Sequence, residues 1–303
     1  MWKNRKTYQA LFVIILVALI TVVSAVTENA RDYNIDLTFS EDDISQVEFT
    51  ESQSYVKMID VGQGDCTLVR SYNYAFLIDC GTYQSGQHIV QTLLNDEVER
   101  LEFILISHPH LDHMGGFISV ASQIDVGSII IDTMSPYGDD ECDEYSDIID
   151  YCEENEINII AKDTLENFTL GDFKVEFLPE YSYPDDENDR SIITRVTAYG
   201  TRFLFTGDMT KDYEKYLIKS GVSLSCEVLK VAHHGSRYSS CNKFLEKTGC
   251  QIALISAGLD NPYNHPHSQV LERLNKNNIT YYRTDLHGDI TVNPETLAVK
   301  CEK

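Results

Sequence analysis

The sequence is poor in positive charge. It contains 24 Lys and Arg residues against 48 Asp and Glu residues, which gives a formal net charge of −24. Proteins that hold nucleic acid gain much of their affinity by neutralising phosphates, so this composition argues against a broad basic surface for DNA or RNA. It leaves open a nuclease whose metal ions supply positive charge at one site. The hydrophobic fraction of 43% is sufficient for a substantial packed core.

A charge-free stretch near the N-terminus indicates export. Residues 7–27 contain no charged side chain, and three basic residues precede them. We interpret residues 1–30 as a targeting segment whose basic end stays inside, so that the rest of the chain is secreted or faces the extracellular side. A signal peptide cleaved after Ala25 and a single uncleaved membrane anchor through residues 7–27 both fit this pattern.

The rest of the chain divides into an acidic linker, residues 31–54, and one packed domain, residues 55–303. Short strand patterns recur through that domain with helical patterns between them and no internal repeat. This arrangement predicts two sheets covered by helices rather than a doubly wound parallel sheet. The acidic stretch 139–156 is expected to be a solvated helix with one apolar stripe. Calcium binding or repulsion of a polyanion is the alternative.

None of the eight cysteines has the paired spacing of a zinc knuckle or the CxxC spacing of a redox site. An exported chain permits disulfides. Three pairs are candidates because their members are close in sequence or symmetric about a turn: Cys142 with Cys152, Cys241 with Cys250, and Cys66 with Cys80. A small buried thiol is an equally good interpretation of each cysteine.

Residues 103–116, Phe-Ile-Leu-Ile-Ser-His-Pro-His-Leu-Asp-His-Met-Gly-Gly, concentrate potential metal ligands. An apolar run predicts a short buried strand, and it is followed closely by His108, His110, Asp112 and His113. Imidazole together with carboxylate suits Zn, Mn or Fe rather than Ca or Mg. The His-x-His pair and the adjacent Asp-His pair could face two metals at once. The alternative is a surface turn that happens to be rich in histidine.

Three later motifs supply matching groups. Asp208 ends one apolar strand pattern, and the pair His233 and His234 ends another. Because neighbours at a strand end face opposite ways, only one of this pair is expected to point at a given metal. A loop holds His265 and His267 on either side of a proline. Two alternatives stay open: the aspartate could cap the following helix, and the His-Pro-His loop could be rigid and exposed.

These motifs resemble the metallo-β-lactamase superfamily. His-x-His-x-Asp-His follows a strand, Leu-Ile-Asp-x-Gly precedes it, and Thr-Gly-Asp and His-His-Gly-Ser come later. Four stretches resemble the hydrolase domain of ComEC-type DNA-uptake proteins: Asp-Val-Gly-Gln-Gly-Asp (60–65), Phe-Leu-Phe-Thr-Gly-Asp (203–208), Leu-Lys-Val-Ala-His-His-Gly-Ser (229–236) and Tyr-Asn-His-Pro-His (263–267). A phosphorylcholine esterase that acts on teichoic acids is a more distant relative. The resemblance covers about residues 55–295. It implies an α+β fold, the αββα metallo-β-lactamase sandwich, in which two mixed sheets are flanked by helices.

The resemblance also implies a two-metal centre at the edge where the sheets meet, with zinc expected and manganese as the alternative. The His-x-His pair would hold one metal, the Asp-His pair with a later histidine would hold the other, and the later aspartate would bridge them. The expected ligands in chain order are His108, His110, Asp112, His113, Asp208 and His234, with His233 as the alternative to His234.

Other residues would support this centre. Asp79 would orient a ligand histidine. Many members of the superfamily have a further ligand histidine before the bridging aspartate, but this sequence has no histidine between His113 and His233. Asn188 occupies roughly that place, as in the ComEC-type pattern. The first metal is therefore expected to be weakly held.

The chemistry follows from these groups. A water between two divalent metals loses a proton near neutral pH and becomes a nucleophile, and the metals stabilise the charge that builds on the substrate. A nearby imidazole can protonate the leaving group. The expected catalytic residues are Asp112 together with the candidate proton donors His267, His265 and His233, whereas Ser236 and Arg237 could contact a phosphate.

We therefore expect a metal-dependent hydrolase that cleaves phosphodiester bonds outside the cytoplasm, with extracellular DNA as the first-choice substrate by resemblance alone. A cell-envelope phosphodiesterase or phosphorylcholine esterase is one alternative, and the net charge of −24 favours it. A lactam or lactone hydrolase is a second, disfavoured by the missing histidine. A non-catalytic metal-binding module is a third, and the complete first motif argues against it. With at most one membrane span, the chain is not expected to conduct DNA by itself.

Overall fold

The computed structural model describes residues 54–132, 143–181 and 186–303. The expected targeting segment, residues 1–30, and almost all of the expected linker, residues 31–54, lie outside this part, so that division of the chain stays a prediction. Among the described residues, no helix combines the length and apolar character needed to cross a membrane.

The first sheet has eight strands of mixed direction. In spatial order they are β17 (Val299–Cys301), β16 (Ile290–Val292), β1 (Ser54–Met58), β2 (Cys66–Ser71), β3 (Tyr74–Cys80), β5 (Phe103–Leu105), β7 (Ser128–Ile131) and β8 (Asn158–Ala161). Neighbours are antiparallel from β17 to β3 and parallel from β3 to β8. A short parallel ribbon pairs β4 (Arg100–Leu101) with β6 (Asp125–Val126).

The second sheet has seven strands, also of mixed direction. In spatial order they are β15 (Thr280–Arg283), β14 (Ile252–Ile255), β13 (Val228–Lys230), β12 (Thr201–Phe205), β11 (Thr194–Ala198), β10 (Phe173–Phe177) and β9 (Phe168–Leu170). Neighbours are parallel from β15 to β12 and antiparallel from β12 to β9. Each sheet therefore has a parallel part whose strand ends can present loops at one edge, the usual place for a ligand site.

Alternating side chains of the strands separate the core into layers. In β3, Phe76 and Ile78 belong to the apolar cluster between the two sheets, whereas Leu77 belongs to the cluster on the helix side. In β12, Phe205 faces the inter-sheet cluster and Leu204 faces the opposite helices. Each sheet thus buries both of its faces, one against the other sheet and one against helices.

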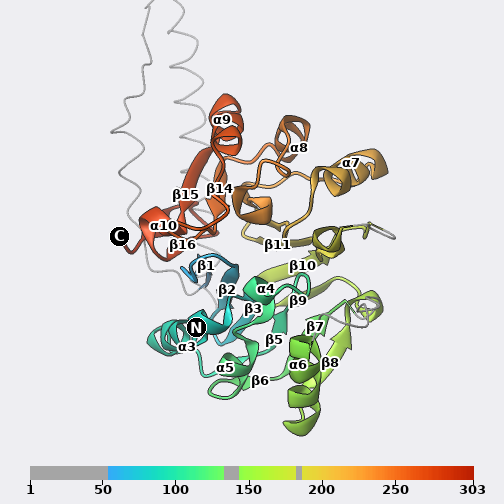
Figure 1. Ribbon diagram of the computed structural model, residues 1–303, viewed down its shortest axis with the longest axis vertical. Helices are drawn as coiled ribbons and strands as arrows, with labels where there is room; N and C mark the ends of the chain where they lie inside the picture. Colours follow the sequence, from blue (N-terminus) through green and yellow to red (C-terminus); the bar gives the residue numbers. More distant parts are fainter. Residues whose placement is uncertain (1–53, 133–142, 182–185) are drawn as a thin grey trace, which may run out of the picture. The chain divides into compact units, whose positions relative to one another are not determined.

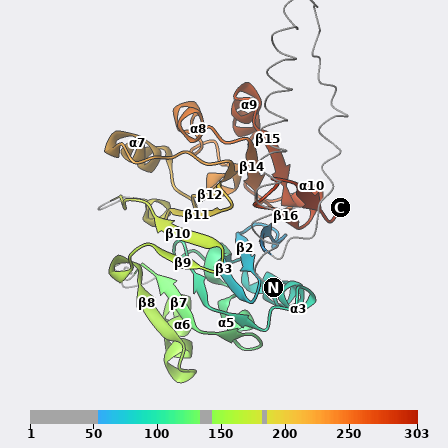
Figure 2. The same cartoon turned by 180° about the vertical axis from the view of Figure 1, so that it is seen from behind.

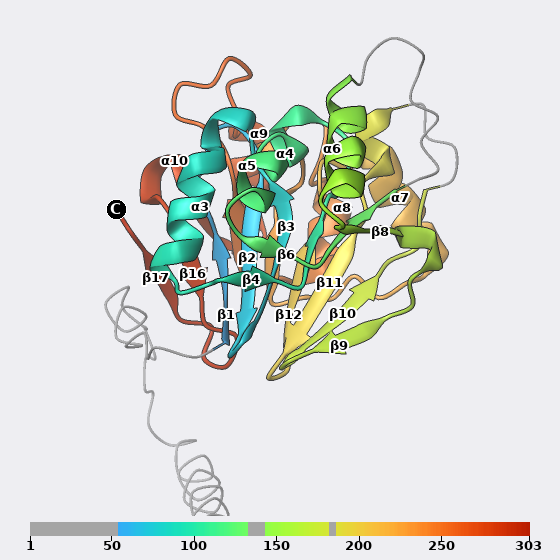
Figure 3. The ribbon, with the colours of Figure 1, turned by 90° about the horizontal axis from the view of Figure 1, so that it is seen from below.

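Helices cover the two outer faces, so the domain has four layers (Figure 1, and from behind in Figure 2). The first sheet is covered by α3 (Gly86–Asn95), α5 (Phe117–Ala121) and α6 (Asp143–Glu154), which lie in front of it in Figure 3. The second is covered by α7 (Lys211–Ser220), α8 (Asn242–Thr248) and α9 (Ser268–Lys276). The short α10 (Thr284–His287) follows β15. These layers confirm the expected αββα sandwich with two mixed sheets.

The acidic stretch forms α6, in agreement with the expected solvated helix. Ile148 and Cys152 are buried in the cluster on the helix side of the first sheet. Asp147 and Glu153 are exposed on the other side of the helix. The first part of the stretch, residues 139–142, lies outside the described residues.

The cysteines of the described part are free thiols. Cys66 and Cys80 are partners in the β2–β3 register, as the predicted hairpin requires. Cys250 lies against Cys226 rather than Cys241, because parallel pairing of β13 with β14 brings the residues before both strands together. The proposed pairing of Cys241 with Cys250 is therefore wrong in this structure. Cys142 lies outside the described residues.

Candidate metal centre

Ligand side chains from both sheets converge where the parallel strands end. The first motif follows β5 and runs into the one-turn helix α4 (Leu111–Met114), while the later ligands follow β12 and β13. The possible ligand atoms of two groups lie within 4.8 Å of one another: His108, His113 and Asp208 in one, and Asp112, His113 and His234 in the other. Segments far apart in the sequence thus build one centre, as predicted.

His113 is fixed from behind by a buried carboxylate. Its Nδ1 lies 2.8 Å from Oδ2 of Asp79. The same carboxylate accepts hydrogen bonds from the backbone N–H of Ser107, at 2.7 Å, and from its hydroxyl, at 2.8 Å. The carboxylate places the imidazole proton on Nδ1 and leaves Nε2 facing the site, an arrangement typical of metal-binding histidines. This geometry suits the orienting role expected for Asp79.

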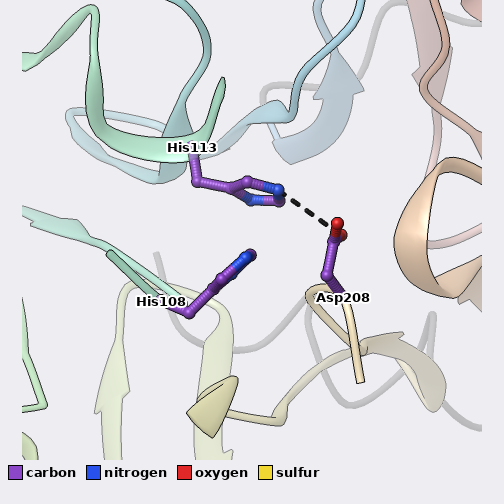
Figure 4. A group of neighbouring side chains, drawn as sticks. All are labelled: His108, His113 and Asp208. Atoms are coloured by element: carbon purple, nitrogen blue, oxygen red, sulfur yellow. Dashed lines mark ion pairs between the residues drawn. The ribbon is translucent and has the colours of Figure 1, made fainter. Parts of the chain in front are cut away.

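His113 and His108 point into the same space as Asp208 (Figure 4). The Nε2 atom of His113 lies 3.4 Å from Oδ1 of Asp208. Both atoms are buried, and neither has a hydrogen-bond partner. Unpartnered buried polar atoms are costly, and a cation between an imidazole nitrogen and a carboxylate oxygen would satisfy both. The residues therefore fit a divalent transition metal.

Asp112 and His234 form the other side of the centre. Nδ1 of His234 donates to the carbonyl oxygen of Ser256 at 3.0 Å. Its Nε2 lies 3.2 Å from Oδ2 of Asp112 and 3.3 Å from Oδ2 of Asp208. Burial opposes ionisation of Asp112, but the neighbouring histidines outweigh it and lower the pKa of this carboxyl to about 2. An imidazole nitrogen that faces two carboxylates is a suitable place for a metal ion.

The two adjacent histidines lie in a tight turn rather than at a strand end. β13 ends at Lys230, and Ala232–Gly235 form the turn η5, in which His233 and His234 both have left-handed backbones, with φ of 53° and 51°. Strand alternation therefore does not decide which ring faces the site, contrary to the expectation. Burial distinguishes them, because the side chain of His234 is 2% exposed and that of His233 is 26% exposed. His233 still places Nε2 3.7 Å from Asp208.

The His-Pro-His loop packs on this turn. The backbone N–H of His267 donates to the carbonyl of Gly235 at 3.0 Å. The ring centroid of His265 lies 5.6 Å from that of His233 and 6.1 Å from that of His234. His267 lies beyond His265, and the centroids of these two rings are 5.0 Å apart. The loop therefore adds an outer layer of imidazoles to the centre.

Both loop imidazoles are neutral near pH 7. Burial and the adjoining histidines lower the pKa of His265 to about 4. Burial, and then the Arg237 guanidinium, lower the pKa of His267. The backbone N–H of Arg237 donates to Nδ1 of His267 at 3.2 Å. The proton of neutral His267 is therefore on Nε2, which can donate a hydrogen bond.

The side of the centre formed by His110 is more open. Nδ1 of His110 lies 3.0 Å from Nε2 of His108, and its Nε2 lies 3.2 Å from Oε2 of Glu187. The side chains of His110 and Glu187 are 35% and 68% exposed. Asn188, in the turn η4 (Glu187–Arg190), has a buried Oδ1 without a hydrogen-bond partner. That the first metal is weakly held stays a prediction.

Two buried charged residues of the centre, Asp65 and Lys230, are not among the predicted site residues. Oδ1 of Asp65 lies 3.5 Å from Nδ1 of His234. The ammonium group of Lys230 pairs with Asp65 and lies 3.6 Å from Oδ1 of Asp208. A lysine inside an otherwise apolar strand pattern is the one signal that points to Lys230 before the structure is known.

The glycine before Asp65 allows two loops of the first sheet to meet, one before β2 and one after β5. A Cβ atom on Gly64 would lie 2.5 Å from the backbone carbonyl oxygen of Asp112. The N–H of Asp65 donates to the same carbonyl at 3.0 Å. Only glycine leaves room for this close approach, which explains its place in the Asp-Val-Gly-Gln-Gly-Asp motif.

The two candidate phosphate contacts, Ser236 and Arg237, differ in exposure. Ser236 is buried, and its Oγ accepts the backbone N–H of Tyr238 at 3.4 Å. It holds the turn after the histidines, and its contact with a phosphate stays a prediction. Arg237 is exposed beside His267, with its guanidinium 5.1 Å from the ring centroid of Tyr238. Of the two, Arg237 is the accessible group.

Residues 59–258 match the family described as the metallo-beta-lactamase superfamily. The match spans most of the chain, so the chain belongs to this superfamily. Together with the ligand groups of the centre, membership makes it a metal-dependent hydrolase.

Curated relatives include a competence protein and a recombination protein. Competence protein ComA of Neisseria gonorrhoeae is 34% identical over 241 residues, which cover 78% of this chain and 32% of the relative. ComE operon protein 3 of Bacillus subtilis is 27% identical, over 79% of this chain and 33% of that protein. Recombination protein 2 of Haemophilus influenzae is 25% identical, over 78% and 28%. The chain thus spans about a third of the length of these relatives. The resemblance to ComEC-type hydrolase domains is confirmed.

Solved structures support the fold. A variant of the β-hydroxylase CmlA superposes with a TM-score of 0.55 at 14% identity, over 80% of this chain and 54% of that protein. Igni18, a metallo hydrolase from Ignicoccus hospitalis, superposes with a TM-score of 0.50 at 10% identity, over 79% and 99%.

Proposed function

We propose that this hydrolase cleaves phosphodiester bonds outside the cytoplasm, with DNA as its first-choice substrate. The observation that carries the proposal is the layered site, in which buried metal ligands are followed outward by His265, His267 and exposed Arg237. An anionic phosphate suits such a site, because a cationic centre and a guanidinium can bind its oxygens while an imidazole donates to the leaving group.

The buried and the exposed residues of the centre would have different roles. When bound, two divalent ions would activate water and stabilise negative charge on the reacting group. Asp79 keeps His113 in the tautomer that presents Nε2, and Ser256 does the same for His234 through Nδ1. Nε2–H of His267 would donate a hydrogen bond to the leaving oxygen, and the imidazolium form would transfer a proton to it. Arg237, next to it, would orient the phosphate.

DNA is proposed as the substrate because of the names of the relatives. One of them is named a competence protein and another a recombination protein, and the matched region is this domain. The net charge of −24 means that affinity for DNA would have to come from the centre itself rather than from the surrounding surface.

That charge also favours a second candidate, a phosphodiester of the cell envelope such as a phosphocholine group. A zwitterionic substrate carries its own positive charge and meets less repulsion from an acidic surface than a polyanion does.

The test combines metal analysis with a substrate panel. We expect about two metals per chain after loading and the loss of one on dialysis, because the His110 side of the centre is open. The panel contains single- and double-stranded DNA, bis-p-nitrophenyl phosphate, p-nitrophenylphosphorylcholine and nitrocefin. Cleavage of DNA supports the first candidate, and cleavage of the choline ester alone supports the second. Turnover of nitrocefin only would identify a lactam hydrolase, and metal binding without any turnover a non-catalytic module.

Export is proposed from residues 1–30, which lie outside the described part of the chain. Cell fractionation and N-terminal sequencing of the mature protein test it. A new N-terminus at Val26 identifies a cleaved signal peptide, and an intact chain in the membrane fraction identifies an anchor through residues 7–27. An intact chain in the cytoplasm would contradict export.

A further inference from the structure

Lys230 lies where an apolar residue is expected. It is the last residue of β13, two positions after Val228, which belongs to the apolar cluster between the sheets. Residues two apart on a strand face the same side, so the lysine enters the inter-sheet layer. It is 4% exposed. A lysine is almost never fully buried unless its charge is paired.

Its partners come from both sheets. The ammonium group pairs with Asp65, which directly precedes β2 of the first sheet. It donates to the carbonyl oxygen of Gly207 at 2.9 Å and lies 3.6 Å from Oδ1 of Asp208, both of which follow β12 of the second sheet. Lys230 therefore links the two sheets at the centre itself.

The surrounding charge is strongly negative. The centre contains four carboxylates: Asp65, Asp79, Asp112 and Asp208. Carboxylates gathered away from water repel one another and lose hydration, so the arrangement needs positive charge nearby. Divalent metals would supply it in the loaded protein. In the metal-free protein, Lys230 supplies a positive charge that is already in contact with two of the carboxylates.

We propose that Lys230 is an internal counter-cation, which keeps the metal-free centre assembled and is opposed by the metals that later occupy it. The inference rests on the metal-dependent function proposed above. It makes Lys230 a positioning residue rather than a ligand, because an ammonium group has no lone pair to offer a metal.

The ammonium group and the metals stabilise the same carboxylates and repel each other, so each reduces the favourable effect of the other. Removing the ammonium should therefore destabilise the metal-free protein and strengthen metal binding. A residue that only keeps ligands in place would have the opposite effect, since its loss would weaken metal binding.

The test uses the full chain carrying Lys230→Met, which keeps most of the side-chain volume. Thermal unfolding is measured in chelator and with saturating Zn²⁺ or Mn²⁺, and affinity by competition with a chromophoric chelator. We expect the metal-free unfolding temperature to fall by roughly 10 °C and the metal-loaded one to fall much less. The metal dissociation constant should decrease by at least about fivefold. An equal fall of the unfolding temperature in the metal-free and the metal-loaded protein, or weaker metal binding, would overturn the proposal.

Two further variants complete the design. Lys57→Met removes an ammonium that pairs with Asp96 at 2.6 Å and contacts none of the ligands, so it should lower both unfolding temperatures equally. The double variant Asp65→Asn with Lys230→Met restores the net charge of the centre and should recover a metal response close to that of the unmodified chain. If Lys230→Met does not fold, the double variant decides: its failure to fold would contradict a charge role. If the unmodified chain binds no metal at all, the proposed function itself fails.

Discussion

Nε2 of His234 lies 3.2 Å from a carboxylate oxygen of Asp112, although 122 residues separate the two in the sequence. The first residue belongs to a turn after a strand of the second sheet, and the other to a one-turn helix after a strand of the first. The contact exists only because the two sheets meet at this edge, and it defines the second half of the metal centre.

From this contact we expect different effects from the two adjacent histidines. His234→Ala should remove most of the metal from the site formed with Asp112, because the buried ring aims Nε2 at two carboxylates. His233→Ala should spare most of the bound metal, because its ring is partly exposed. Metal content by mass spectrometry of both purified variants measures this. Equal metal loss in the two variants would mean that both rings are ligands.

Asp208→Ala should abolish metal binding and activity together while the domain stays folded. Helix α7 begins at Lys211, and its cap is Thr210, whose side chain accepts from the N–H of Asp212 at 3.2 Å. The alternative in which Asp208 caps this helix is therefore wrong. Thr210→Ala is the matched control and should cost about 1 kcal/mol of stability with metal content unchanged. Full turnover by Asp208→Ala would exclude a bridging role.

Asp79→Asn should weaken metal binding by about tenfold to a hundredfold, because the amide no longer favours the Nδ1–H tautomer of His113. The backbone should tolerate the change, since φ at this position is 61° and asparagine, like aspartate, adopts left-handed conformations. Ser107→Ala leaves the backbone bond to Asp79 intact and should have a smaller effect. Isothermal titration with Zn²⁺ measures the metal affinity of the unmodified chain and of the two variants. Unchanged affinity in Asp79→Asn would show that the carboxylate only supports the fold.

His267→Ala should leave metal content intact and lower turnover of substrates with poor leaving groups by roughly a hundredfold or more, the usual scale for losing a general acid. The loss should shrink for p-nitrophenyl esters, whose leaving group needs no proton. A residue that only positions substrate would raise KM without this dependence. Normal turnover of both substrate types would mean that His267 has only a structural role. His265 or His233 would then be the candidate proton donor.

His265 should make the metal-free protein sensitive to mild acid. Its pKa is about 4 in the folded chain against 6.5 for the free side chain. Between these values the unfolded chain binds the proton and the folded chain does not, so stability falls as the pH drops from 6.5 to 4. His265→Gln should flatten this part of the curve in urea unfolding. An unchanged slope in His265→Gln would contradict the burial of this imidazole.

Some features of the centre can be predicted from the sequence because they are local. An apolar run that ends in His108, His110, Asp112 and His113 must deliver these groups to a strand end, whatever the rest of the chain does. The hairpin that opposes Cys66 and Cys80 follows in the same way from symmetry about a turn. The role of Asp79 was accessible through family resemblance, and the contact with His113 agrees with it.

Other features depend on packing between distant segments. The strand pattern before His233 predicts alternation, but the chain leaves the strand at Lys230 and turns through two left-handed residues. A serine hydroxyl can bind a phosphate, but the hydroxyl of Ser236 is buried and accepts a hydrogen bond from the N–H of Tyr238. Neither outcome has a signal in the local sequence, because each is decided by which neighbours occupy the space.

The sequence by itself determined the class of the protein, the ligand types and the strand ends that carry them, because periodicity and residue chemistry act over a few neighbouring positions. Only the tertiary structure decided that Asp65 and Lys230 belong to the centre, since their charges become paired only when the two sheets pack face to face. Burial has the same origin. It sets the low pKa of His265 and it selects His234 over His233, and it depends on atoms that the chain brings together from both halves of the fold.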